Sequence, residues 1–581
     1  MKLRYSLPLI LLGTTLAVAQ PGYQAPPSFS HVVIIFQENR TPDNLFGAGA
    51  GPEPTCGSEY DFEHGVDIDN GGPNLASQEN GGPYVTCLAA NSGLITGGGY
   101  HGHNGNDTGH PNEGWVPQCD YSSSTGSCQM DGACLGTWPN CPQYQFVDKP
   151  AVQPYFDIAT NYGFANYMFS THEGPSFPAH QFIFGGSSAP VWPGDTYYQW
   201  FVAEQPGDRQ HAGCPATSGW PNWVDPDNND VPGKINSQCY DRNTLVTYQD
   251  SNGVVHDWTA SWSLPYPAWK YYVPVDNSGD PLAGVWNAPA DDPQICYFSS
   301  SGGRTACDPL NNSEYMTHVS VAQNSNMMSA PILTDIGNCQ LPAISWVIPD
   351  ERWSDHPGNF DLGMGPDWVA AVVDAIGQSA SNSGGVCDYW GTSTTAQRIE
   401  PTVIFITWDD WGGFYDHVPP PAMYFGNGSD QCTPTSGNAN SWGCGYVYGF
   451  RVPLLVASEW TPASYVSGAL PPYGPGEDAA HTHDFGSILA FTENNFNLPP
   501  IAPQTPVKYT YADQNSLDRT YNGLPAVPLW DFFLGPQRAF TYISPILSTH
   551  TASFFENYYY DTGQSPLGPE EVAPGVNDPL D

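Results

Sequence analysis

The stretch TVIFITWDDWGG, residues 402–413, gives the clearest indication of the fold in this 581-residue chain. It begins as a mostly apolar, β-branched run, which is typical of a strand buried in a parallel sheet. The run ends in the adjacent acids Asp409 and Asp410. Because Gly412 and Gly413 allow a sharp turn, both carboxylates can converge on one cation. The alternative is that one acid caps the turn and the other is solvated.

Three further apolar runs end in polar residues, as buried strands do when they deliver side chains to one edge of a sheet. They are HVVIIF (31–36), AISWVI (343–348) and VPLLVAS (452–458). Helical patterns occur at 367–376 and at 484–496, the second with an acidic cap. Alternating strands and helices predict an α/β fold, a three-layer α/β/α sandwich around a largely parallel central sheet. Ligands of such sheets bind beyond the carboxyl ends of the strands.

The first 19 residues have the pattern of a cleavable signal peptide. A charged start, MKLR, precedes an apolar run at 7–17 and the small-residue triplet AVA at 17–19. A membrane anchor is the alternative, but the run is shorter than the roughly 20 residues that span a bilayer. We therefore predict export, to the extracellular space or the periplasm, and no transmembrane segment.

Residues 20–560 are expected to form a single domain. Loop-rich insertions at about 45–150 and 190–330 are predicted to cover its functional site. Residues 561–581 are acidic and proline-bearing, and are expected to form a flexible tail. The sequence leaves the oligomeric state open.

Fourteen cysteines, an even number without any CxxC pair, predict disulfides in an exported chain. Several are expected to link the stretch between Cys56 and Cys141. The alternative is buried, reduced cysteines.

The net charge of −43 arises from a shortage of bases, since 58 acids face only 15 Lys and Arg. Charged residues make up 13% of the chain, against roughly 25% in typical domains. Protonation of the carboxylates near pH 4 therefore leaves few repelling positive charges, and we expect tolerance of acid. So few bases argue against nucleic acid as a partner.

Glu38 and Asn39 follow the first apolar run and offer hard oxygen ligands suited to calcium, magnesium or manganese. Taken alone, Glu38 is more often an ion-pair partner of a neighbour such as Arg40. Ser176 lies in the turn EGPSFP, where a metal-bound serine at a helix N-terminus could attack phosphorus. Its commoner role is that of a cap or turn residue.

Histidines can stabilise phosphoryl oxygens or protonate a leaving alkoxide. Candidates for these roles are His101, His103, His356, His417, His481 and His483. For any one of them, a structural role is the more frequent outcome.

Several motifs, in order, resemble the bacterial phosphoesterase family that holds secreted non-haemolytic-type phospholipases C and respiratory-burst-inhibiting acid phosphatases. The matching blocks are HVVIIFQENRTPDNLFG, CQMDGAC, GPSFPAHQFIFGG, LPAISWVIPDERWSDHPG, ITWDDWGGFYDHVPPP, GFRVPLLVAS and HTHDFGSILAFTENNF. They cover most of residues 30–500, and the DDWGG-YDHVPPP and ENR-DNLFG blocks are the specific ones. The resemblance implies an alkaline-phosphatase-like core.

The resemblance also implies roles for individual residues. One divalent cation, calcium, magnesium, manganese or zinc, would bind Glu38, Asn39, Asp409, Asp410 and Ser176, with Ser176 also the nucleophile. His356 and either His101 or His103 would lie beside the phosphate, and His481 or His483 would face the site.

This chain departs from the family pattern at three places. Ala179 replaces an asparagine near the serine. The histidine-bearing segment after WNAP is replaced by ADDPQICYFSSSGGRTACDP, and the HTHDFG block is one residue shorter.

These observations predict a secreted, metal-dependent hydrolase of phosphate esters, similar to an acid phosphatase and acting through a phosphoserine. The expected partner is a small phosphoester or a phospholipid head group. One alternative is a phospholipase C, because abundant Trp and Tyr can hold choline, although a core that ends near residue 560 favours the phosphatase. A second alternative is an exported metal-binding protein without activity. Sulfatase chemistry is disfavoured, because no C-x-P-x-R sequence occurs.

Overall fold

The computed structural model describes residues 27–46, 149–172, 174–188, 268–273, 285–292, 330–349, 353–356, 364–416, 418–421, 448–468, 482–501 and 527–556. Short pieces are also described between 89 and 147, between 201 and 257, at 295, and between 512 and 525. The predicted signal peptide, the predicted tail and most of the two predicted insertions lie outside these residues.

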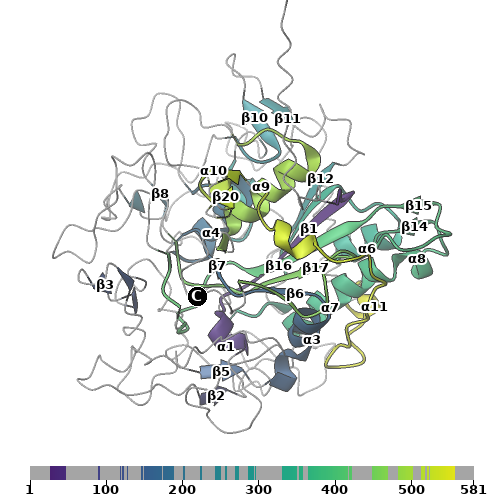
Figure 1. Cartoon of the computed structure of the whole chain (residues 1–581), viewed down its shortest axis with the longest axis horizontal. Coiled ribbons are helices and arrows are strands. Elements are labelled where there is room, and N and C mark those ends of the chain that lie inside the picture. The colour runs from purple at the N-terminus through teal and green to yellow at the C-terminus, as the bar shows by residue number, and fades with distance from the viewer. Residues whose placement is uncertain are drawn as a thin grey trace, which may run out of the picture.

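A seven-stranded, largely parallel sheet forms the centre of the described structure (Figure 1). Only β17 runs against its two neighbours, while the other pairs are parallel. The order across the sheet is β12 (Trp269–Tyr272), β13 (Ile344–Val347), β1 (His31–Gln37), β16 (Thr402–Trp408), β17 (Leu454–Ala457), β6 (Gly163–Ala165) and β18 (Tyr465–Ser467). The α/β class with a largely parallel sheet is confirmed.

All four predicted strands form, but β17 corrects the expectation that each delivers its polar end to one edge. Its register pairs Leu454 with Thr407 and Ala457 with Ile404, antiparallel to β16. The carboxyl end of β17 therefore lies at the opposite edge of the sheet, and its amino end places Arg451 near the carboxyl end of β16.

Helices contact both faces of the sheet. On β16, successive side chains point to opposite faces. Phe405 packs on Phe491 of α9, with ring centroids 5.2 Å apart, whereas Trp408 packs on Tyr155 of α3 at 5.0 Å. Figure 1 shows α4 and α9 on one side of the sheet and α3 and α7 on the other. The larger helices are α3 (Gln153–Asn161), α4 (Ser176–Gly185), α6 (Pro331–Gly337), α7 (Met364–Gly377) and α9 (Phe485–Phe496).

Both predicted helices are confirmed, as α7 and α9. At the start of α9, the Asp484 side chain accepts a hydrogen bond from the Ser487 backbone N–H at 2.8 Å. The Ser487 hydroxyl in turn accepts from the Asp484 N–H at 2.9 Å, which completes a capping box. None of the helices in the described part of the chain is long and apolar enough to cross a membrane.

Shorter elements surround this core. The small helices are α1 (Pro42–Phe46), α8 (Ser379–Asn382), α10 (Ala512–Asn515), α11 (Ala552–Glu556) and the 3-10 helices η4 (Lys149–Val152), η5 (Ala288–Asp291) and η10 (Trp530–Phe533). The two-stranded pairs include β7 (Met168–Phe169) with β19 (His483–Asp484) and β14 (Cys387–Asp388) with β15 (Arg398–Ile399).

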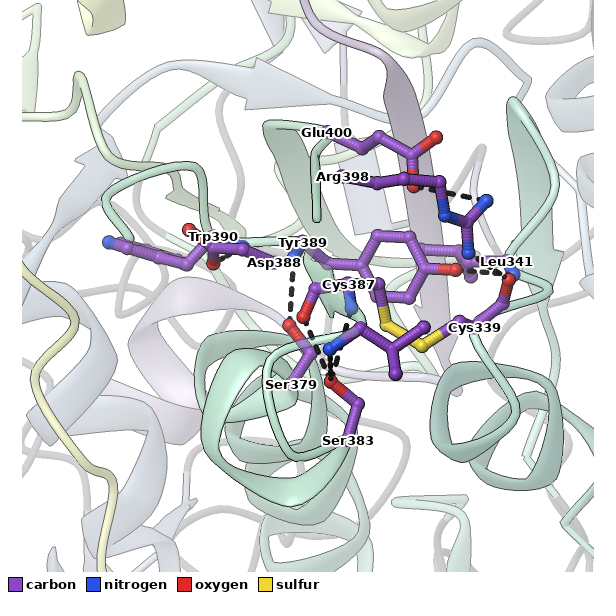
Figure 2. The surroundings of a disulfide bond; sticks show 11 residues. Cys339, Leu341, Ser379, Ser383, Cys387, Asp388, Tyr389, Trp390, Arg398 and Glu400 are labelled. Carbon is purple, nitrogen blue, oxygen red and sulfur yellow. Dashed lines mark hydrogen bonds and ion pairs between the residues drawn. A yellow bond between two sulfur atoms is a disulfide. The ribbon is translucent and has the colours of Figure 1, made fainter. Parts of the chain in front are cut away.

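A disulfide joins Cys339 to Cys387 across 48 residues, at the edge of the sheet where β13 and β16 begin. Figure 2 shows it beside the ring of Tyr389. The Tyr389 hydroxyl accepts a hydrogen bond from the Leu341 N–H at 3.0 Å, and its ring lies 4.9 Å from that of His31, the first residue of β1. Cys119 is also disulfide-bonded, and no described cysteine is free. The other cysteines in the predicted cluster between Cys56 and Cys141 lie outside the residues whose side chains are described.

We expect the double variant Cys339→Ser/Cys387→Ser to unfold several degrees below the wild type. Cross-linking a loop of 48 residues stabilises a fold by about 4 kcal/mol through the lost entropy of the unfolded chain. Because the bond lies at the edge opposite Glu38, turnover at 25 °C should be unchanged. Thermal unfolding with and without reductant checks this, and an equal melting temperature for both proteins would contradict it.

Asp374 is a buried acid on α7 whose Oδ1 accepts a hydrogen bond from the Ile543 N–H at 2.9 Å. Burial raises the pKa of Asp374 to about 8. The folded chain therefore keeps a proton that the unfolded chain releases near pH 4. The folded state consequently loses stability as pH rises from about 4 to about 8.

Asp374→Asn is accordingly expected to raise the melting temperature by several degrees at pH 7 and to leave it unchanged at pH 4. The asparagine keeps the acceptor for Ile543 but does not ionise, so the chain no longer has to take up a proton at this position when it folds at pH 7. Thermal unfolding at pH 4, 5.5 and 7 tests this, and a variant that is less stable at pH 7 would refute it. Burial also raises the pKa of Asp355, to about 6, so this acid likewise lowers the stability of the fold as pH rises from about 4 to about 6. Both pKa shifts favour stability in mild acid, and the acid tolerance expected from the composition stays a prediction.

Candidate metal centre and active site

The carboxyl ends of β1 and β16 lie side by side, with Gln37 paired to Trp408. The residues that follow, Glu38 and Asp409, therefore emerge next to each other. The backbones of the two loops then approach closely, since a Cβ on Gly412 would lie 2.3 Å from the Asn39 carbonyl oxygen. Gly412 also has φ +61°, a value that L side chains rarely adopt. The predicted sharp turn after the paired acids is confirmed.

The two aspartates divide their oxygens between the loop and the site. Oδ1 of Asp409 accepts hydrogen bonds from the N–H groups of Asn39 and Asp410, at 2.9 and 2.7 Å. Oδ1 of Asp410 accepts from the Gly412 N–H at 2.7 Å. Both Oδ2 atoms remain available to the site, and Asp409 Oδ2 is buried without a hydrogen-bond partner. Capping of the turn and convergence of the carboxylates therefore occur together.

Ser176 is the first residue of α4, as predicted from its turn, and it points at the strand ends. Its Oγ lies 3.2 Å from Glu38 Oε2, 3.5 Å from Asn39 Oδ1 and 3.4 Å from Asp410 Oδ2. No side chain caps this helix end, whose N-cap is Pro175. Free N–H groups at a helix N-terminus favour an anion.

His180 is a functional candidate that the sequence analysis missed. It lies one helical turn after Ser176, and its Nε2 is 3.0 Å from Glu38 Oε1 and 3.8 Å from Asp409 Oδ2. Its Nδ1 lies 3.2 Å from the Tyr271 hydroxyl. Burial lowers the pKa of His180 to about 4. The signal was the spacing of Ser176 and His180, because residues four apart share one helix face.

The centre concentrates negative charge in the interior. Burial raises the pKa of Glu38 well above its usual range, and the nearby charges of Asp409 and Asp410 raise it further. Ligand atoms of Glu38, His180 and Asp409 all lie within 4.8 Å of one another. Buried acids this close are stabilised by a cation, and the unpartnered Asp409 Oδ2 fits one. This buried group could therefore hold a metal ion.

Two of the 15 Lys and Arg residues hold the loops of the site together. Arg451 is buried and bonds Asp43 Oδ1 at 3.1 Å and Asp416 Oδ1 at 3.0 Å. It thereby links the chain after β1 to the chain after β16. Arg40 donates to the Asp355 carbonyl oxygen at 2.7 Å and lies 4.8 Å from the centre of the Phe414 ring.

His356 lies at the same edge of the sheet, in a segment tied to β1. The preceding residue, Asp355, donates its N–H to Gln37 Oε1 at 2.9 Å and accepts from the Tyr155 hydroxyl at 2.7 Å. The His356 ring is 6.5 Å from that of Trp286. The structure therefore places His356 near the strand ends that carry Glu38.

Of the remaining predicted histidines, His483 is the one that the structure describes. His101, His103, His417 and His481 lie outside the described residues. His483 contacts Ser467 Oγ through Nε2 and Asp518 Oδ2 through Nδ1, both at 2.7 Å. These contacts have the order of a catalytic triad, but all three side chains are buried, at 3% exposure or less. His483 is thus held between β18 and Asp518, and the assignment of His481 or His483 to the site stays a prediction.

The fold and the site define an α/β protein with a buried acidic centre where two parallel strands meet a helix N-terminus. Over residues 29–499 the chain matches the Phosphoesterase family, and it belongs to that family. The family named from the motifs is thereby confirmed.

The chain is also similar in sequence to several curated phospholipase C proteins. The chain is 28% identical to the non-hemolytic phospholipase C of Burkholderia pseudomallei over 40% of this chain and 30% of that protein. It is 31% identical to phospholipase C B of Mycobacterium tuberculosis over 28% of this chain and 27% of that protein. It is 23% identical to the hemolytic phospholipase C of Pseudomonas aeruginosa over 59% of this chain and 38% of that protein. The chain thus spans well under half the length of these relatives.

Proposed function

We propose that this protein is a secreted, metal-dependent hydrolase of phosphate esters. The observation that carries the proposal is the position of Ser176 Oγ, within 3.5 Å of oxygens from Glu38, Asn39 and Asp410 at the start of α4. Membership of the Phosphoesterase family supports the reaction class, and the phospholipase C relatives support phosphoester substrates.

The proposed cation ligands are Glu38, Asn39, Asp409, Asp410 and Ser176. A bound divalent cation would lower the pKa of the serine hydroxyl and neutralise charge on the phosphoryl oxygens. Such help matters because Arg40 and Arg451, the arginines described beside the site, are held by contacts with its loops.

In the proposed reaction, Ser176 Oγ releases its proton to solvent water and attacks phosphorus while the bond from phosphorus to the leaving oxygen breaks. The N-terminus of α4 favours the incoming anion. A histidine on the phosphate side protonates the leaving alkoxide, with His356, His101, His103 and His481 as candidates. Water then hydrolyses the phosphoserine and restores Ser176.

The same proposal includes the finer features expected from the sequence. The helices on both faces of the sheet support a three-layer α/β/α sandwich of the alkaline-phosphatase type, in one domain over residues 20–560. The charged and apolar start at 1–19 supports export. The helix α4 forms with Ala179 in place, its N–H bonded to the Pro175 carbonyl oxygen at 3.3 Å. The helical turn that presents Ser176 therefore forms with alanine at position 179.

A substrate panel tests the proposal. A simple phosphomonoester releases phosphate if the protein acts as a phosphatase, whereas a lecithin analogue releases phosphocholine if it acts as a phospholipase C, the second candidate that the relatives' names favour. We expect phosphate release to be the faster of the two. No turnover of any phosphoester between pH 3 and 8, with each divalent cation supplied, would refute the proposed function.

A further inference from the structure

His180 presents one ring nitrogen to the acids of the proposed metal centre. Its Nε2 lies 3.0 Å from Glu38 Oε1 and 3.8 Å from Asp409 Oδ2, and none of the three side chains is exposed. The structure also shows what its other nitrogen does. Nδ1 lies 3.2 Å from the hydroxyl of Tyr271, on β12.

The hydrogen bonds behind His180 fix which nitrogen carries the proton. The Tyr271 hydroxyl donates to the Trp286 carbonyl oxygen at 2.8 Å. Because a carbonyl oxygen can only accept, the phenolic hydrogen is used in that bond. The Tyr271 oxygen must then accept from His180, so Nδ1 carries the hydrogen. In a neutral imidazole of this tautomer, Nε2 has a lone pair and no hydrogen.

A lone pair directed at two carboxylates needs either a hydrogen or a cation between the three groups. The ligand atoms of Glu38, His180 and Asp409 lie within 4.8 Å of one another in the interior. Asp409 Oδ2 has no hydrogen-bond partner there, and an unsatisfied buried acceptor costs about 1–3 kcal/mol. A cation bound by these three atoms removes both penalties.

We infer that His180 Nε2 is itself a ligand of the cation, together with Glu38 and Asp409. This inference rests on the proposed metal-dependent function. Ligating histidines usually donate their second N–H to an oxygen that fixes the ring, as His180 does through Tyr271 and Trp286. Imidazole suits zinc and other first-row transition metals, whereas calcium and magnesium prefer oxygen ligands alone. The nitrogen ligand therefore raises the affinity for a zinc-like cation relative to that of a centre with oxygen ligands alone.

The test compares metal-stripped wild type with His180→Asn, and uses His31→Asn as a matched control. His31 is also buried, but it begins β1 at the far end of the strand, about 20 Å away. Electron paramagnetic resonance of copper-loaded protein counts the imidazole nitrogens on the ion. We expect His180→Asn to lose one nitrogen and His31→Asn to lose none.

Cation affinity gives a second readout. In His180→Asn we expect zinc affinity, measured by chelator competition, to fall about 100-fold or more and calcium affinity to fall less than about 10-fold. Tyr271→Phe, which removes the acceptor that orients the ring, should lower zinc affinity by about 10-fold. If His180 instead only donated a hydrogen bond to Glu38 from Nε2, Tyr271→Phe would cost no affinity.

An unchanged nitrogen count in His180→Asn, or a wild type without any imidazole nitrogen on the ion, overturns the inference. If His180→Asn does not fold, zinc affinity in Tyr271→Phe decides the question. None of these measurements uses a substrate. If the wild type hydrolyses esters but His180→Asn keeps the nitrogen count, only the role of His180 is refuted. If His180→Asn loses one nitrogen but the wild type hydrolyses no ester, only the proposed function is refuted.

Discussion

Ser176→Ala is expected to lower turnover of a chromogenic phosphomonoester by about 1,000-fold or more, because the variant lacks the oxygen that attacks phosphorus. Ser176 Oγ is the hydroxyl that contacts Glu38, Asn39 and Asp410 at once. The fold should be unaffected, since alanine fits a helix and this serine caps nothing. Steady-state kinetics and thermal unfolding together measure both effects.

The matched control is Ser188→Ala, just after α4. Ser188 is also buried, and its Oγ donates to the Val202 carbonyl oxygen at 2.9 Å. Its loss should cost some stability and leave turnover near that of the wild type. Ser176→Ala protein that keeps more than about a tenth of wild-type turnover would show that another group attacks phosphorus.

Asp409→Asn has the second large effect, on cation binding and through it on turnover. The amide oxygen can keep the two backbone hydrogen bonds that Asp409 Oδ1 accepts from Asn39 and Asp410. The amide nitrogen then replaces Oδ2, which removes a negative charge and puts a donor where the cation is proposed to bind. We expect cation affinity to fall about 100-fold or more and turnover to fall with it.

Asp374→Asn serves as the matched control, because it makes the same isosteric change at a buried acid on α7. It should bind the cation as the wild type does. Calorimetric titration of stripped protein measures the affinities, and high cation concentrations show whether Asp409→Asn turnover recovers. An Asp409→Asn variant that binds and turns over like Asp374→Asn would contradict the assignment of Asp409 as a ligand.

Much of the core could be predicted from sequence because its strands are continuous apolar runs. The runs at 31–36 and 402–407 became neighbouring parallel strands, so the polar residues after them met at one edge. The helix at 484–496 could be predicted from its apolar spacing and its acidic cap. These features depend on residues close in the chain, which a sequence pattern records directly.

The direction of β17 could not be predicted in this way. An apolar run buried on both faces reads the same whichever way it lies in the sheet. Its reversal is visible only in the register of Leu454 with Thr407. The reversal also explains how Arg451 comes to bond Asp43 and Asp416, which are 408 and 35 residues away in the chain.

The residues that gather at the candidate site could largely be predicted from the strand ends. The hydrogen bonds of its acids and the presence of His180 could not. Glu38, Asn39, Asp409, Asp410 and Ser176 lie together as expected. Which carboxylate oxygen of Asp409 and of Asp410 faces the site depends on hydrogen bonds within the loops. The spacing of residues in the sequence does not indicate these bonds. His180 could not be predicted in the same way, because it lies in the apolar segment FPAHQFIF, at 177–184, whereas the predicted histidines lie in polar loops.

We propose that hydrolysis of phosphoesters by this protein depends on a divalent cation bound at Glu38, Asp409 and Asp410. The most direct test is the rate of hydrolysis of a chromogenic phosphomonoester by wild-type protein, first as purified, then after chelation and dialysis, and then after addition of zinc, manganese, magnesium or calcium. Protein shown to be free of metal is expected to keep about 1% or less of its activity, and addition of one of these cations should restore it. Full activity in protein shown by elemental analysis to contain no metal would contradict a metal-dependent reaction.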